Sequence, residues 1–238
     1  MVVDKVAADK YISGCLDFSR QLPTFRDIWQ GDSVYELSGF LSDSQVSDIA
    51  HRVMSDWPRT YPYQESDGTH CIRCLGQNFW SLPNHPEFDD VFDPELRAYM
   101  LTQYRDINLL VENFCKDYLQ RTPEYIPGIA TPGFNIVTSD IAGTYWHIDT
   151  ALARKMHNID VNRIISINIP IQCDDLSHTE FRLSEFETYQ AKFTTGSMLI
   201  WPGRKLHRFG CQPILKDHHR ITYQCHIYDA GDRALIYF

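Results

Sequence analysis

The second half of this 238-residue chain consists of short apolar runs separated by turn residues. Several short strands with Gly- and Pro-rich turns between them are typical of a β-sandwich or barrel, because each strand needs a neighbouring strand and a covering layer. We therefore predict a mostly β, α+β protein with a jelly-roll core. The predicted strands are Phe134–Val137, Tyr145–Asp149, Ile164–Gln172, Tyr189–Phe193, Ser197–Trp201 and Ile221–Tyr228.

The first half carries helical patterns instead. Ser42 and Gln45 form a capping-box pattern, which predicts a helix that ends near Asp56. Pro94 begins the longest predicted helix, whose apolar stripe to about Arg121 is typical of a core-facing surface. We expect these two helices to cover one face of the sheet.

The pattern predicts a single domain. A helical and loop region, residues 1–130, would support the jelly-roll core of residues 131–238. A further helix is predicted over residues 4–20. Residues 58–94 are rich in Pro, Gly, Asn and Asp, and are expected to form loops with short strands.

Composition restricts the class of protein. Hydrophobic residues make up 43% of the chain, which is enough for a sizeable core, and no apolar run reaches the roughly 18 residues of a membrane span. The net charge of −9 disfavours a surface that follows nucleic-acid phosphates. Seven cysteines without a regular framework favour free thiols, and the first residues lack the form of a signal peptide. We expect a cytoplasmic protein without nucleic-acid or membrane partners.

One pair of residues suggests a metal site. His147 and Asp149 are two residues apart, so on a strand both side chains point to the same face. His207 would supply a third ligand from a distant strand. Two histidines and one carboxylate suit non-heme Fe(II), which needs open positions. The pair alone is weak, since about one such pair is expected by chance in a chain of this composition.

The order of the surrounding motifs adds weight to the pair. A loop containing glycine, 141–144, precedes it, a glycine-started apolar strand, 196–203, leads to His207, and Arg220-Ile221-Thr222 follows. Over residues 131–228 this order resembles the Fe(II)/2-oxoglutarate-dependent oxygenases, whose core is a double-stranded β-helix. Residues 35–42 and the helix after them look like the start of the prolyl-hydroxylase-like branch.

The resemblance implies a set of roles. His147, Asp149 and His207 would be the iron ligands, and hence the catalytic residues. Arg220 would pair with the distal carboxylate of 2-oxoglutarate, and Thr222, on the same strand face, would donate its hydroxyl to it. If Arg220 does not hold the carboxylate, Arg163 is the next candidate.

Four further side chains are candidates for the pocket. Ser166 and Asn168 interrupt an apolar strand, and the string is similar to a strand of the aspartyl/asparaginyl β-hydroxylase-like branch whose polar groups contact 2-oxoglutarate. That branch has basic or aromatic groups there, so this sequence departs from it. Tyr145 shares a face with the ligand pair and could line the substrate pocket or pack. Trp201 could be a pocket wall or a core residue.

The expected activity follows from the resemblance. It implies a dioxygenase that uses Fe(II), 2-oxoglutarate and O2 to oxidise an unactivated C–H bond, with hydroxylation as the default outcome. Halogenation is disfavoured because related halogenases lack the carboxylate that Asp149 provides. A small molecule, such as an amino acid or a natural-product intermediate, is the leading substrate class.

Two alternatives remain open. A peptide or protein side chain could be the substrate, with residues 58–94 forming a groove. A cupin-like metal-binding protein or isomerase is the other, because the spacing from Gly196 to His207 loosely matches half of a cupin motif. Arg220 discriminates, since a cupin has no need of a buried arginine facing the metal.

Other metal-ligand residues have simpler interpretations. His178 and Glu180 form a second His-x-acid pair, but we predict that they are not ligands and lie in a loop or at the surface. Cys71 and Cys74 could bind zinc only with two more ligands, such as His70 and His85, and ordinary thiols are favoured. His226 is expected to be a core residue.

Overall fold

The computed structural model describes residues 24–63, 72–76, 93–129, 131–137, 145–150, 156, 158–174, 177–210 and 219–238. The predicted helix over residues 4–20, the loop 141–144 and the residues Cys71, His70 and His85 lie outside this described part.

Strands in the described part form two sheets. The larger has nine strands in the order β1-β9-β6-β11-β5-β3-β2, with β12 paired to β11 and β4 paired to β12. All its pairings are antiparallel except that of β12 with β4. Its strands are β1 Tyr35–Leu37, β2 Tyr61–Tyr63, β3 Ile72–Leu75, β4 Thr122–Tyr125, β5 Gly133–Val137, β6 Ile164–Gln172, β9 Met198–Pro202, β11 Arg220–Asp229 and β12 Arg233–Tyr237.

The smaller sheet has the order β10-β7-β8. Its strands are β7 His178–Arg182, β8 Thr188–Lys192 and β10 His207–Gly210. It packs face to face on the larger sheet, where Phe181 of β7 meets Trp201 of β9 with ring centroids 5.4 Å apart in an edge-on arrangement. The two facing antiparallel sheets form the jelly roll.

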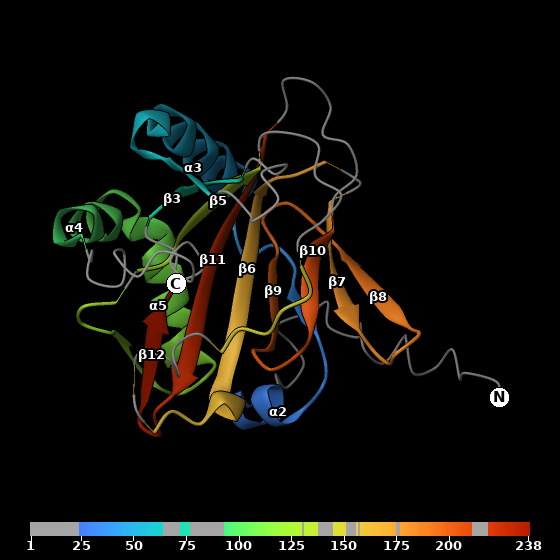
Figure 1. Ribbon diagram of the computed structural model, residues 1–238. Helices are drawn as coiled ribbons and strands as arrows, with labels where there is room; N and C mark the ends of the chain where they lie inside the picture. The colour runs from blue at the N-terminus through green and yellow to red at the C-terminus, as the bar shows by residue number, and fades with distance from the viewer. Residues whose placement is uncertain are drawn as a thin grey trace.

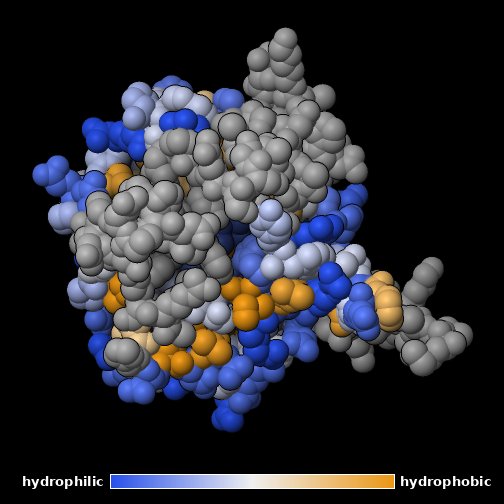
Figure 2. All heavy atoms as spheres, viewed as in Figure 1, coloured by the Kyte–Doolittle hydropathy of each residue, from blue (hydrophilic) through white to orange (hydrophobic). Residues whose placement is uncertain are grey.

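Helices cover the opposite face of the larger sheet. They are α2 Phe25–Gln30, α3 Asp43–Ser55, α4 Pro94–Gln103 and α5 Arg105–Asp117, with 3-10 turns η1 Trp57–Arg59 and η4 Val161–Arg163. Figure 1 shows α3, α4 and α5 on one side of the sheet and the strands β7, β8 and β10 on the other. Hydrophilic residues cover most of the described surface in that view, and hydrophobic ones gather across its lower middle (Figure 2).

Alternation along two central strands separates the core from the site. On β11, Ile221, Tyr223, Cys225 and Ile227 belong to the main core with the helices, as do the isoleucines at 165, 167, 169 and 171 of β6. The intervening residues therefore point toward the smaller sheet, because successive side chains of a strand alternate between its faces. This second face carries six polar residues of the two strands: Ser166, Asn168, Arg220, Thr222, Gln224 and His226.

Most predicted strands are confirmed, with shifts of one or two residues at their ends. The capping box is confirmed as well: the Ser42 side chain accepts from the Gln45 backbone N–H, and the Gln45 side chain accepts from the Ser42 N–H. The single helix predicted from Pro94 to Arg121 is wrong. It is broken at Tyr104, whose ψ of 32° is not helical.

The break at Tyr104 has a tertiary cause. Its side chain is fully buried, its hydroxyl donates to Asp56 at 2.7 Å, and its ring lies against Phe134 with centroids 4.7 Å apart. A new helix then begins at Arg105, and its buried face includes Ile107 and Val111. Local propensity is a weak preference that such packing overrides.

Two further differences concern strands that the sequence pattern missed. His178 and Glu180 were expected in a loop or at the surface, but they lie on β7 and are buried. β12 and β4 were also missed. No helix among the described residues has both the length and the apolar character needed to cross a membrane.

Candidate metal centre

A short segment, residues 145–150, carries two of the three predicted ligands. The strand predicted over Tyr145–Asp149 is reduced to a single bridge, in which the His147 N–H donates to the His207 carbonyl at 2.8 Å and the His207 N–H donates back at 3.0 Å. Asp149 is held separately, since its N–H donates to the Gly203 carbonyl at 2.7 Å. These bonds place the segment beside β10 with both ligand side chains on one face.

Gly203 allows the Asp149 backbone to approach closely. A Cβ atom at this position would lie 2.6 Å from the Ile164 Cγ2 and 3.0 Å from the Asp149 carbonyl oxygen. Both separations are shorter than side chains tolerate without movement, so the absence of a side chain here is part of the site's geometry.

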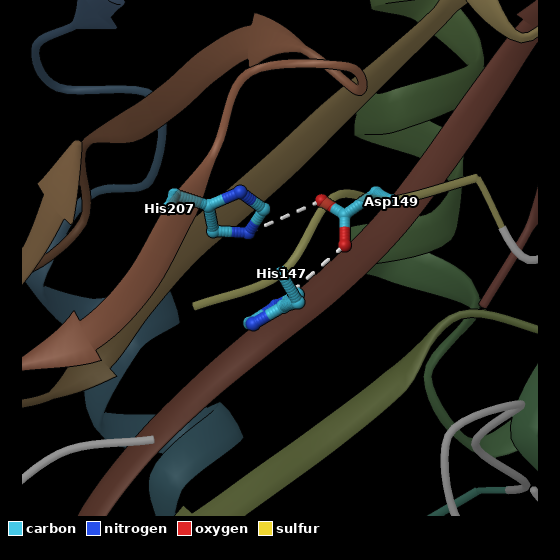
Figure 3. A group of neighbouring side chains, drawn as sticks. All are labelled: His147, Asp149 and His207. Carbon is cyan, nitrogen blue, oxygen red and sulfur yellow. Dashed lines mark ion pairs between the residues drawn. The ribbon is translucent and has the colours of Figure 1, made fainter. Parts of the chain in front are cut away.

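The structure brings His147, Asp149 and His207 together. One ligand atom from each lies within 4.8 Å of the other two. The His207 Nε2 is 3.3 Å from the Asp149 Oδ2, and the His147 Nε2 is 3.8 Å from its Oδ1. Figure 3 shows the three side chains pointing toward one another, His207 from β10 and the other two from the 145–150 segment.

Both imidazole rings turn the same nitrogen toward the centre. The His147 Nδ1 donates to the Tyr145 carbonyl at 2.8 Å, and the His207 Nδ1 donates to the Lys205 carbonyl at 2.8 Å. Burial lowers the pKa of His207 to about 4. Its ring is therefore neutral at pH 7, with the Nε2 lone pair directed at the carboxylate.

Asp149 is a buried carboxylate, 1% exposed. Burial alone would raise its pKa, but the surrounding histidines His207, His226 and His147 and the hydrogen bond from Ser166 hold that pKa below its ordinary value. Its Oδ1 has no hydrogen-bond partner among the described residues.

These atoms fit a metal cation. A neutral Nε2 and a carboxylate oxygen that face each other at 3.3 Å are both acceptors, and no proton lies between them. The buried Asp149 charge accepts one hydrogen bond, from Ser166, and a cation bound by all three groups would offset the remaining cost of its burial. The donor set, two imidazole nitrogens and one carboxylate, matches the facial arrangement of non-heme iron sites.

Arg220 is buried between the two sheets, 2% exposed. Its guanidinium carbon lies 3.2 Å from the centroid of the Phe209 ring and 4.1 Å from that of Phe193. Thr222 is also buried and points to the same face of β11. Arg163, the alternative anchor, instead forms an ion pair with Asp229 at 3.3 Å.

The other candidate pocket residues fall into different surroundings. Ser166 donates to the Asp149 Oδ2, and Asn168 is buried two residues along the same strand face. Tyr145 has a side chain 58% exposed beside His147. Trp201 is buried edge-on against the His207 ring, with centroids 5.1 Å apart. Contacts of these four with 2-oxoglutarate or substrate stay predictions.

The second His-x-acid pair has partners of its own. Glu180 accepts from the Arg208 guanidinium and from Gln190, and its Oε1 lies 3.3 Å from the His178 Nε2. Among the described residues, the group with metal-binding geometry contains neither His178 nor Glu180.

Sequence reasoning missed two features around the metal ligands. His226 was interpreted as a core residue, yet its Nδ1 lies 3.8 Å from the Asp149 Oδ2. Its six-residue separation from Arg220 on one strand was a signal that both share a face. The second feature is Trp146, whose ring centroid lies 4.5 Å from the guanidinium carbon of Arg182 and 4.8 Å from that of Arg208.

Comparison with known proteins gives matches only among solved structures. Neither models of protein families nor curated proteins match this sequence. A prolyl hydroxylase from Trichoplax adhaerens, in complex with a hypoxia inducible factor peptide fragment, has a TM-score of 0.52 at 13% identity, covering 88% of this chain and 89% of that one. The chain shares its fold.

Two further structures have the same fold. A Pseudomonas putida prolyl-4-hydroxylase has a TM-score of 0.50 at 14% identity, covering 84% of this chain and 94% of that one. The non-heme alpha ketoglutarate dependent carbocyclase SnoK from nogalamycin biosynthesis has a TM-score of 0.50 at 10% identity, covering 93% and 98%. At these identities the likeness establishes the fold, and function has to be argued from the site.

Proposed function

We propose that this protein is an Fe(II)/2-oxoglutarate-dependent dioxygenase. The observation that carries the proposal is the buried group of His147, Asp149 and His207, in which the neutral His207 nitrogen faces a carboxylate. The fold that it shares with prolyl hydroxylases and a carbocyclase supports the same conclusion.

The three residues would hold Fe(II) through His147 Nε2, His207 Nε2 and the Asp149 carboxylate. When bound, the iron supplies the oxidative chemistry that couples decarboxylation of 2-oxoglutarate by O2 to oxidation of the substrate. This chain contributes the ligand geometry. The Tyr145 and Lys205 carbonyls fix both imidazole tautomers, so that Nε2 needs no proton rearrangement to bind metal.

Arg220 and Thr222 would hold the distal carboxylate of 2-oxoglutarate. A guanidinium stays charged when buried and matches a carboxylate with two parallel hydrogen bonds. Phe209 and Phe193 cover the Arg220 guanidinium and keep water from it, which strengthens its attraction for an anion. Asn168 and Ser166 face the same interior and complete the polar wall.

We propose a small organic molecule as the substrate and hydroxylation as the reaction. SnoK, a carbocyclase of nogalamycin biosynthesis, supports a small-molecule substrate on this fold. Two residues before His147, Tyr145 exposes a large aromatic side chain that suits a substrate with an apolar part. The carboxylate of Asp149 argues against halogenation, as expected from the sequence.

A peptide side chain is the second candidate. The Trichoplax adhaerens prolyl hydroxylase was solved with a peptide fragment, and its fold is shared over 88% of this chain. A cupin-like isomerase is less well supported, because Arg220 is a buried cation on the inner face of the jelly roll and such an enzyme has no use for it.

A succinate-release assay tests the proposal. Protein loaded with Fe(II) and 2-oxoglutarate is incubated with a panel of amino acids, metabolites and proline-containing peptides, and succinate and oxidised product are measured. We expect stoichiometric succinate and hydroxylated product with a member of the small-molecule panel, and none with His207→Ala or Asp149→Ala. Turnover with peptides alone would select the second candidate. Equal succinate release by wild type and both variants would overturn the assignment.

A further inference from the structure

Two buried residues outside the metal triad, Ser166 and His226, form a chain of hydrogen bonds that ends at the Asp149 carboxylate. The Ser166 hydroxyl donates to the Asp149 Oδ2, and the Ser166 Oγ lies 3.1 Å from the His226 Nδ1. All three residues are at most 2% exposed. Ser166 and His226 are directly paired across β6 and β11, so the sheet itself brings them together.

The direction of these hydrogen bonds follows from counting protons. Asp149 is ionised and can only accept, so the single hydroxyl proton of Ser166 points to its Oδ2. The Ser166 oxygen then offers only lone pairs to the His226 ring. The His226 Nδ1 must therefore carry a proton and donate it to Ser166, which sets the tautomer of His226.

This arrangement leaves the two carboxylate oxygens unequal. Oδ2 accepts from Ser166, while Oδ1 accepts no hydrogen bond from the described residues and lies on the side of the His147 Nε2. A carboxylate held by one oxygen cannot rotate about its Cβ–Cγ bond without breaking that hydrogen bond. Such fixation orients a ligand before the metal binds.

The ring of His226 is itself held in place. It pairs with Tyr237 across β11 and β12, with ring centroids 5.3 Å apart. This contact fixes the position of the ring, and the hydrogen bond to Ser166 fixes which edge of the ring faces β6. The position therefore lacks the freedom of an ordinary core residue.

We propose that His226 and Ser166 are positioning residues, which hold the Asp149 carboxylate by its Oδ2 and so fix its orientation toward His147 and His207. This inference rests on the proposed function only in taking Asp149 as a metal ligand. It predicts that the two residues act as one unit, with His226 working through Ser166.

Mn(II) binding tests the proposal, and the electron paramagnetic resonance signal of free Mn(II) measures it. 2-Oxoglutarate is left out, so that a contact between Ser166 and the co-substrate does not affect the result. Ser166→Ala should raise the Mn(II) dissociation constant about 10-fold or more, as loss of such partners does in other metal sites. His226→Leu should weaken binding in the same direction.

The matched variant is His226→Asn. Asn and Leu are similar in size, but the Asn amide nitrogen is bonded to Cγ as Nδ1 is in histidine, so it can still donate to Ser166. His226→Asn should therefore retain Mn(II) affinity within about threefold, whereas His226→Leu should not. Adding His226→Leu to Ser166→Ala should weaken binding by less than about twofold further, because residues in one network are not additive.

The outcomes separate the two hypotheses, with folding of each variant checked by circular dichroism. If His207→Ala abolishes Mn(II) binding but Ser166→Ala binds as wild type does, the positioning role of Ser166 and His226 is wrong, while the metal site is retained. Equal losses in His226→Asn and His226→Leu would likewise overturn the role of His226, since size alone would explain them. If wild type binds Mn(II) no better than His207→Ala does, both the metal site and the positioning role of Ser166 and His226 are wrong.

Discussion

At the scale of single residues, burial decides what each polar group of the site can do. The His207 ring is neutral because it is buried, and its Nδ1–H is already bonded to the Lys205 carbonyl. Asp149 keeps its charge despite burial because histidines and a hydroxyl surround it. Arg220 keeps its charge because a guanidinium stays protonated even when it is buried. The result is a group of metal-binding side chains beside the smaller sheet and a buried guanidinium on the inner face of the larger sheet.

Replacing Arg220 should affect the co-substrate more than the metal. In Arg220→Ala, the apparent KM for 2-oxoglutarate should rise at least about 30-fold, because losing one partner of a buried charge pair costs about 2–5 kcal/mol. The Mn(II) dissociation constant should stay within a few-fold. The measurement is succinate release against 2-oxoglutarate concentration.

Arg163→Ala is the control for that variant, because Arg163 pairs with Asp229 and not with the site. Its KM for 2-oxoglutarate should remain that of wild type. A rise in KM with Arg163→Ala, and none with Arg220→Ala, would move the carboxylate anchor to Arg163.

The metal-free protein should lose stability in mild acid through His207. Its pKa is about 4 in the folded state and near 6.5 when unfolded. Between these values the unfolded chain takes up a proton that the folded chain refuses, so the free energy of unfolding falls as pH drops from 6.5 to 4. Above pH 6.5 this contribution is absent.

Urea unfolding of metal-free protein at several pH values between 4 and 7 measures the effect. His207→Asn, which keeps a polar side chain but cannot titrate, should show a shallower decline of the free energy of unfolding than wild type. Parallel pH profiles for the two proteins would show that His207 is not the titrating group.

At the scale of elements, the 145–150 segment carries two of the metal ligands but has only one β-bridge of regular structure. One bridge and the Asp149–Gly203 bond hold its backbone. Trp146, on the side opposite His147, adds a third attachment, because its ring contacts Arg182 of β7 and Arg208 of β10. Glu180 accepts from Arg208 and so fixes one of them. The outer face of the smaller sheet thereby helps to position a ligand on its inner side.

Removing the Trp146 ring should therefore loosen His147. Trp146→Ala should raise the Mn(II) dissociation constant about 10-fold, since two cation–π contacts at partly exposed sites are worth roughly 1–2 kcal/mol together. Hydrogen exchange of residues 145–150 should also speed up. Trp146→Phe retains an aromatic face and should stay close to wild type, whereas equal losses in Trp146→Ala and Trp146→Phe would rule out the arginine contacts as the cause.

At the scale of the whole molecule, the far end of β11 ties separate parts of the chain together. Asp229 accepts from the Trp29 indole of α2 at 3.3 Å, from Arg121 before β4 at 3.1 Å and from the Gly231 N–H at 3.0 Å, and it pairs with Arg163 of η4 at 3.3 Å. Burial opposes its ionisation, but these partners hold its pKa below the ordinary value. Asp229 lies at the opposite end of β11 from Arg220, so its role is to hold the architecture.

Asp229→Asn should destabilise the whole fold, because it leaves two arginines without their shared anion. We expect the free energy of unfolding to fall by about 3 kcal/mol. Asp232→Asn, in the same turn but with a side chain 90% exposed, should change it by less than about 0.5 kcal/mol. Urea unfolding of metal-free protein at pH 7 compares them, and equal values for the two variants would contradict the role given to Asp229.

Much of the fold could be predicted because strand alternation is a local property. In residues 164–171 and 220–228, one face is apolar and the other carries the polar groups, and a period of two residues is visible in the sequence itself. The same period places His147 beside Asp149 and Arg220 beside Thr222. For these residues the chain needs only strand geometry to bring the side chains to a common face.

Only the tertiary structure decided the features that depend on contacts between distant segments. Tyr104 breaks a helix because Asp56 and Phe134 hold its side chain. His178 is buried because Gly210, its neighbour across β7 and β10, leaves room for the ring, where a Cβ would lie 2.2 Å from its Nε2. His226 reaches Asp149 through Ser166, 60 residues away in the chain. No local pattern records which distant side chains meet, which strands pair or where a neighbour lacks a side chain, and those facts set these three positions.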